Sequence, residues 1–263
     1  MNILIVTQED PFYIPIFFER FMDVYVEDFN IHIKGLIIQE PIGEKSILGL
    51  AKKMWNFYGP IDFLKQSYRY GLSKLNNILY FKGLRKSNFS VEYFVKSRGV
   101  SLLNYKDVNS KEFIDFVEKE EIDLIVSVSA SQIFKKEILN TPQYGCINMH
   151  NAPLPYYRGM LPNFWQMYND EKCSILTIHQ MVETLDKGDI IYQNETKITE
   201  DMTLDDLIRK TKYNSADTLW EVLLKYEKGT IKMKSLPDVE GSYYTFPTKK
   251  DVYEFKKKGK RLL

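Results

Sequence analysis

The sequence predicts an α/β protein with a Rossmann-like, mostly parallel sheet, helices on both faces and a helical insertion. Short apolar runs bounded by turn residues alternate with longer helical patterns, which is typical of strands joined by helical crossovers. The chain has 263 residues, of which 44% are hydrophobic and 27% are charged. This length and composition fit one globular domain with a small appendage.

The apolar runs place the secondary structure elements along the chain. We expect strands over 2–6, 31–38, 91–95, 123–128, 145–149, 174–180 and 189–196. Residues 111–120 predict an amphipathic helix with Phe113, Phe116 and Val117 facing inward. Residues 203–225 predict a long helix that Thr203 caps, with acidic residues in its first turn.

The predicted elements divide the chain into two parts. We expect a catalytic domain over 1–200 and a C-terminal helix with a short extension over 201–263, without a second full domain. Residues 41–90 exceed a standard crossover, so we expect an insertion of one or two helices there. From Lys52 to Arg98 the chain is basic and rich in aromatics. Three interpretations fit this stretch: a solvated helix face, a surface for a diphosphate and a nucleobase, or a surface for RNA or an anionic membrane.

Several function classes lack support in the composition. The net charge of +1 gives no sign of a nucleic acid partner. Cys146 and Cys173 form no CxxC pair and stand without a histidine cluster, so we expect buried thiols and no metal. The turn over 7–11 lacks the glycines that bind a dinucleotide. No run is long enough to span a membrane and no basic leader begins the chain, so we expect a cytoplasmic protein. The basic run over 256–261 predicts a solvated, frayed end.

The densest group of unusual residues begins at Asn148 and His150. Because side chains alternate along a strand, both should share one face and point into the crevice at the strand's carboxyl end. An asparagine amide can donate a hydrogen bond to the oxyanion of an acyl transfer, and an imidazole can accept the proton of an attacking amine. Asp186, in the polar turn over 183–190, is the candidate carboxylate that orients the imidazole.

Two stretches carry a resemblance to a known family. NMHNAPLPYYRGMLPNFWQ and ILTIHQMVETLDKGDII resemble the signature of the folate-dependent formyltransferases, which act on glycinamide ribonucleotide, methionyl-tRNA or sugar nucleotides. The resemblance implies the formyltransferase fold, with Asn148, His150 and Asp186 as catalytic residues. It also implies 10-formyltetrahydrofolate as co-substrate, without a metal, across the carboxyl ends of the central strands.

The resemblance further implies which residues bind the substrates. Those expected at the folate are Ser129, Gln132, Ile133, Leu154, Pro155 and Asp186. Those expected at the acceptor are Gln8, Asp10, Tyr13, Tyr157 and Arg158. His179 also matches the family pattern, and we expect it to be a hydrogen-bonded structural histidine.

The acceptor amine is predicted from loops and from features that the sequence lacks. NAPLPYYRG and the run over 243–248 are most similar to sugar N-formyltransferases of lipopolysaccharide and O-antigen synthesis. These act on a nucleoside-diphosphate-linked dideoxy-amino sugar. The segment after Asp186 is too short for the barrel domain of methionyl-tRNA formyltransferases, and the first turn lacks the phosphate loop of the glycinamide ribonucleotide enzymes. A 10-formyltetrahydrofolate hydrolase, or a transferase acting on either of those two acceptors, stays open. We expect small-molecule partners and no nucleic acid, and we consider a homodimer.

Overall fold

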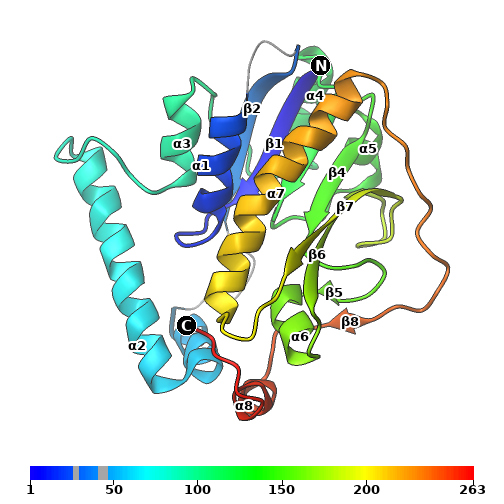
Figure 1. Ribbon diagram of the computed structural model, residues 1–263. Coiled ribbons are helices and arrows are strands. Elements are labelled where there is room, and N and C mark those ends of the chain that lie inside the picture. Colours follow the sequence, from blue (N-terminus) through cyan, green and yellow to red (C-terminus); the bar gives the residue numbers. More distant parts are fainter. Residues whose placement is uncertain (26–29, 41–46) are drawn as a thin grey trace.

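A six-stranded sheet forms the centre of the computed structural model, which describes residues 1–25, 30–40 and 47–263 (Figure 1). The strand order is β2-β1-β3-β4-β6-β7. Strands β1 to β4 run parallel to one another, β6 runs antiparallel to β4, and β7 runs antiparallel to β6. The mostly parallel sheet confirms the predicted fold class. The bounds are β1 (Asn2–Gln8), β2 (His32–Gln39), β3 (Leu124–Val128), β4 (Cys146–His150), β6 (Cys173–Gln180) and β7 (Ile190–Lys197).

Helices cover both faces of the sheet. Helices α1 (Ile14–Val24), α3 (Val91–Ser97) and α7 (Leu204–Glu227) pack on one face, and α4 (Lys111–Lys119) and α5 (Lys136–Asn140) pack on the other. Strand β1 has apolar side chains on both sides, which these helices bury. Ile3 and Ile5 pack in the core with α1 and α7, whereas Leu4 and Val6 pack in the core with α4. This alternation buries a strand on both sides. The expected Thr203 cap of α7 is confirmed by a reciprocal capping box with Asp206.

The segment over 91–95 corrects one predicted element, because it forms helix α3 instead of a strand. The Ser90 side chain accepts a hydrogen bond from the backbone N–H of Tyr93 and caps the helix. Val91 and Val95 lie four residues apart and both are buried. That spacing fits one face of a helix, and a run this short does not distinguish a helix from a strand.

The predicted helical insertion is helix α2 (Ile47–Phe81). It bends at Gly59, which has a φ of 74°, just before Pro60. The part after the bend stands apart from the sheet (Figure 1). Residues 41–46 of the predicted insertion lie outside the described residues. Dividing the chain at residue 200 stays a prediction; α7, which follows that point, packs on the sheet.

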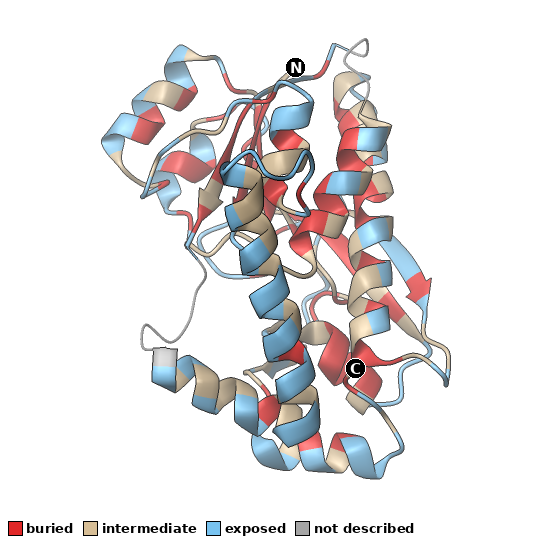
Figure 2. Cartoon of the chain, turned by 90° about the vertical axis from the view of Figure 1, so that its left-hand side faces the viewer, coloured by how far each residue is buried: buried red, intermediate tan, exposed pale blue. Residues whose placement is uncertain are grey.

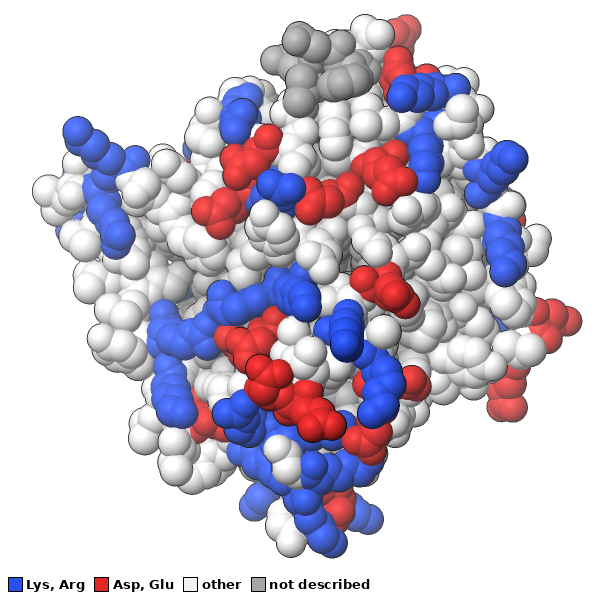
Figure 3. Space-filling model, in the orientation of Figure 1, with Lys and Arg blue, Asp and Glu red and all other residues white. Residues whose placement is uncertain are grey.

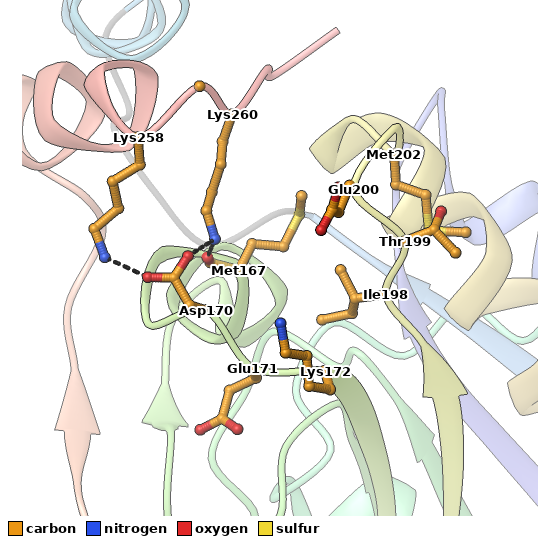
Figure 4. A pocket seen from close by; sticks show the side chains of 11 residues that line it. Met167, Asp170, Glu171, Lys172, Ile198, Thr199, Glu200, Met202, Lys258 and Lys260 are labelled. Carbon is orange, nitrogen blue, oxygen red and sulfur yellow. Dashed lines mark hydrogen bonds and ion pairs between the residues drawn. The ribbon is translucent and has the colours of Figure 1, made fainter.

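The C-terminal segment folds back onto the body. Helix α8 (Lys249–Lys257) packs with α6 (Pro162–Tyr168) and the first part of α2, and β8 (Tyr243–Tyr244) pairs with β5 (Arg158–Gly159). The basic run over 256–261 is largely exposed, as expected, but it is not frayed. Lys258 and Lys260 place their ammonium groups 2.8 and 2.6 Å from the Asp170 carboxylate (Figure 4), and Leu262 is buried. Basic residues gather over this part of the molecule with acids between them (Figure 3). Among the described residues, no helix is long and apolar enough to cross a membrane.

Candidate active site

Asn148 and His150 lie at the carboxyl end of β4, where the sequence predicts them. Ile147 and Met149 pack into the core cluster of α1 and α7. Because side chains alternate along the strand, Asn148 and His150 share its opposite side. Both are half-buried, so each is held by the fold and still reachable by a ligand.

The Asn148 amide is fixed from both neighbouring strands. The Ser127 hydroxyl of β3 donates to its Oδ1 at 3.0 Å, and its Nδ2 lies 3.3 Å from Nε2 of His179 on β6. The strand register pairs Asn148 with both residues. A carboxamide nitrogen carries two hydrogens. One is directed to His179, so the other is free to donate to a ligand.

His179 is held in one protonation state. Its Nδ1 lies 2.9 Å from the Gln180 carbonyl oxygen, which can only accept, so Nδ1 carries the proton and Nε2 accepts from Asn148. Burial is the main cause that lowers the pKa of His179, and His150 adds to it, against the Gln180 carbonyl and the Asp186 carboxylate. A buried, neutral imidazole therefore orients the Asn148 amide.

Asp186 faces His179 and not His150. Its Oδ1 lies 3.7 Å from Nε2 of His179, and both side chains are almost fully buried. Asp186 has a φ of 53°, and a Cβ on Gly188 would lie 1.8 Å from the Gln180 carbonyl oxygen. This close approach turns the loop back over the end of β6. Within the part of the chain that the structure describes, Asp186 makes no hydrogen bond or ion pair with His150, so the expected orienting role toward His150 needs correction. His179, expected to be a hydrogen-bonded structural histidine, is buried and hydrogen-bonded, and it lies between Asn148 and Asp186.

Among the described residues, the His150 side chain makes one hydrogen bond. Its Nε2 lies 3.1 Å from the carbonyl oxygen of Tyr157. A carbonyl only accepts, so Nε2 carries a proton and, in the neutral form, Nδ1 has the free lone pair. That nitrogen can take a proton from a substrate.

Most of the residues expected at the folate lie on the loop after β3 or on the segment after β4. Ser129 and Ile133 are on the loop after β3, and Ile133 is 71% exposed. The Gln132 side chain accepts from Gln39 at 3.0 Å and so fixes this loop. Leu154 and Pro155 are buried. Binding of folate by these residues stays a prediction.

Residues expected at the acceptor are mostly engaged within the protein. Gln8 lies half-buried at the end of β1. Asp10 Oδ1 accepts from the backbone N–H groups of Phe12 and Tyr13 at 2.7 and 2.6 Å, at the start of α1. The Tyr13 hydroxyl donates to Asp205 at 2.8 Å, and burial raises its pKa. Asp10 and Tyr13 therefore shape the loop after β1.

Tyr157 and Arg158 differ in their freedom to bind. Tyr157 is 8% exposed, its ring stacks on Tyr244, and its hydroxyl donates to Glu171 at 2.6 Å. Burial and this hydrogen bond raise the pKa of Tyr157 to about 12. Arg158 Nε is buried and has no hydrogen-bond partner among the described residues, which leaves a donor for a ligand.

Lys212 is a functional candidate that the sequence analysis missed. Its ammonium donates to the Ser129 hydroxyl at 2.8 Å, at the carboxyl end of β3. Burial lowers the pKa of Lys212, and the Asp10 charge opposes that shift. The spacing of Asp205, Arg209 and Lys212 by four and three residues puts them on one side of α7. In the sequence, the signal for Lys212 is this row of charged residues on one side of a helix that packs on the sheet.

Two arginines line a hollow beside the loop after β1. Asp205 accepts from Arg209 at 2.7 Å and lies 3.2 Å from Arg69 of α2. Burial opposes ionisation of Asp205, but the hydrogen bonds from Arg209 and Tyr13 outweigh it, so its pKa is lowered. The hollow has a volume of about 230 Å³. Its lining is Pro11, Phe12, Arg69, Leu72, Ser73, Asn76, Asn88, Phe89 and Arg209.

A hollow of about 330 Å³ lies elsewhere, between α6, the end of β7 and the C-terminal segment (Figure 4). Its walls include Lys172, Glu200 and Lys258, together with Asp170, which is already paired with Lys258 and Lys260. None of the candidate catalytic residues lines either hollow. We relate the arginine-lined hollow to the site because Arg209 lies three residues from Lys212, whose ammonium reaches Ser129 at the carboxyl end of β3.

Comparisons with known proteins show which family the chain belongs to. A family model described as formyl transferase matches residues 80–223. Methionyl-tRNA formyltransferase of Acetivibrio thermocellus is 30% identical over 162 residues, which are 62% of this chain and 52% of the relative. The enzyme of that name from Clostridioides difficile is 40% identical over 133 residues, 51% of this chain and 43% of the relative. The chain spans about half the length of these curated relatives.

Solved structures show the same fold at lower identity. A sugar N-formyltransferase from a Shewanella species aligns with a TM-score of 0.57 and 22% identity, over 94% of this chain and 77% of that one. A phosphoribosylglycinamide formyltransferase from Anaplasma phagocytophilum aligns with a TM-score of 0.60 and 12% identity, over 94% and 99%. These structural likenesses concern the fold, and the family model matches more than half of the sequence. The chain belongs to the formyl transferase family.

Proposed function

We propose that the protein transfers the formyl group of 10-formyltetrahydrofolate to an amine. The observation that carries this proposal is the fixed Asn148 amide, with one N–H free beside the Nδ1 lone pair of His150. Exposed apolar side chains on the two flanking loops, Ile133, Val182 and Leu185, fit the flat pterin of the folate. Asn148, His150 and Asp186 are the proposed catalytic group, and His179 is a positioning residue.

The chemistry follows from the hydrogens that each residue holds. The neutral acceptor amine attacks the formyl carbon, and the carbonyl oxygen becomes an oxyanion to which the free N–H of Asn148 donates. His150 Nδ1 takes the proton from the new ammonium. As the bond between the formyl carbon and the folate nitrogen breaks, His150 returns that proton to the nitrogen. The products are the formamide and tetrahydrofolate.

We further propose that the acceptor is an amino sugar linked to a nucleoside diphosphate. Arg69 and Arg209 supply guanidinium groups, which bind phosphate oxygens in pairs. Phe12 and Phe89 supply aromatic walls for a base in the same hollow. Only the resemblance of the loop sequences supports a cytoplasmic role in lipopolysaccharide or O-antigen synthesis.

Methionyl-tRNA is the second candidate acceptor. The curated relatives at 30% and 40% identity carry that name, and the basic side of α2 can attract RNA phosphates. The two candidates differ in how much of the acceptor the protein must contact. A compact hollow of about 230 Å³ favours the small one.

The test is a mass-spectrometric search for a formylated product. The protein is incubated with 10-formyltetrahydrofolate and, separately, nucleoside-diphosphate amino sugars, methionyl-tRNA and glycinamide ribonucleotide. We expect a formamide on an amino sugar. Formylation of methionyl-tRNA alone would replace the acceptor but keep the reaction, whereas release of formate without any formamide would contradict transfer itself.

A further inference from the structure

Helix α2 carries an exposed apolar stripe on the side away from the arginine-lined hollow. The apolar residues follow the three- and four-residue spacing of helices that pair side by side. They are Ile61, Leu64, Tyr68, Leu75 and Ile78, and they are 70, 66, 68, 50 and 52% exposed. Gly71 occupies the remaining position of this spacing, between Tyr68 and Leu75. We call these six residues the α2 seam. Figure 2 shows this helix facing the viewer, with much of its surface exposed.

Gly71 points to a partner outside the chain. A glycine inside a helix lowers helix stability relative to alanine, so it needs a compensating reason. Nothing lies within 4 Å of the place where a Cβ on Gly71 would be. Packing among the described residues therefore gives no such reason, whereas a large side chain from another molecule would fit there.

We propose that the α2 seam pairs in antiparallel fashion with the α2 seam of a second copy of this chain. In that register Ile61 lies opposite Ile78, Leu64 opposite Leu75, and Tyr68 opposite Gly71. The largest side chain of the seam then meets the smallest, twice, about the two-fold axis. A parallel pair would set Tyr68 against Tyr68 and leave a gap at Gly71.

Charge and area both allow this pairing. Ser67 faces Lys74 of the second copy, and the Lys65 stem runs beside Leu72 of the second copy, so no two like charges meet. The exposed seam offers on the order of 700 Å² per copy, which reaches the low end of specific protein interfaces. Arg69 lies on another side of α2, facing Asp205. The proposed pairing therefore leaves Arg69 facing the hollow, while Leu72, at the edge of the seam, is also one of the hollow's lining residues.

Sedimentation of the full chain tests the proposal. At micromolar concentration we expect twice the chain mass of 31.1 kDa. Leu64→Glu with Leu75→Glu should give the monomer mass, because it buries two charges in each seam. Leu84→Glu is the matched control, since Leu84 is 72% exposed but lies beyond the helix, and it should stay dimeric. A monomeric wild type, or equal dissociation by the control, would overturn the proposal.

Substitutions at Gly71 test the packing itself. Gly71→Leu suits an isolated helix, so the chain should still fold, but it overfills the layer with Tyr68 and should weaken the dimer about tenfold or more. Adding Tyr68→Ala should restore pairing. A Gly71→Leu dimer as tight as the wild type would contradict the register. A wild type that stays monomeric and sediments with phosphatidylglycerol vesicles would overturn the dimer in favour of a membrane surface.

Discussion

The Asn148 centre and the arginine-lined hollow are built in different ways. Asn148, Ser127 and His179 lie on three adjacent strands, and the strand register brings them together. The hollow instead combines Arg69, from the inserted helix α2, with Arg209, from α7. In the proposed function, the sheet fixes the reacting groups and an inserted helix takes part in recognition of the acceptor. Changes in the first region should alter turnover, and changes in the second should alter acceptor affinity.

The largest expected effect is on His150. His150→Ala removes the only proton acceptor proposed for the amine, so kcat should fall about 10³-fold, within the usual range for general base catalysis. The KM of the acceptor and the thermal midpoint should change little. Steady-state kinetics with both substrates varied measures this. Near-native turnover would assign the proton to another group.

His179 should matter less and in a different manner. His179→Gln keeps an acceptor for the Asn148 amide but removes the buried imidazole that fixes the position of that acceptor, so we expect a loss in kcat of roughly tenfold. Protonation of His179 would turn Nε2 from acceptor to donor and release Asn148. The wild type should therefore lose kcat at acid pH, and the variant should lose less. Superimposable pH profiles would show that His179 does not position Asn148.

A substitution of Arg69 tests the role of the arginine-lined hollow. Arg69→Met should raise the KM of a nucleoside-diphosphate amino sugar about tenfold, which corresponds to ~1.4 kcal/mol. The kcat and the KM of the folate should stay near the wild-type values. Lys52→Met is the matched control on the same helix, because Lys52 is exposed and lies outside the α2 seam, and it should be neutral. Equal effects of the two variants would argue for general charge attraction instead of a phosphate site.

The smallest expected effect is on stability against pH. Burial lowers the pKa of His179 in the folded state, whereas an unfolded histidine titrates near about 6.5. Below that pH the unfolded state binds more protons, so folding stability falls as pH falls. Denaturant unfolding at a series of pH values should show a shallower fall for His179→Gln than for the wild type. A steeper fall in the variant would reverse the assigned direction of the shift.

The strands and the Asn148–His150 pair could be predicted because apolar runs and alternation are local. The relation of His179 to Asn148 could not, because it depends on which residues of β4 and β6 pair. The same holds for Asp186, which a left-handed turn brings to His179. The run at Val91 was ambiguous because it is too short to show a period. The basic end was expected to be frayed because Asp170, the partner that holds it, is far away in sequence.

The most direct test of the account is single-turnover formyl transfer by Asn148→Asp. Aspartate has the shape of asparagine but lacks the N–H that is proposed to stabilise the oxyanion. We expect the transfer rate to fall about 10²- to 10³-fold, with the thermal midpoint nearly unchanged. A rate within a few-fold of the wild type would contradict the claim that the Asn148 amide donates in the transition state.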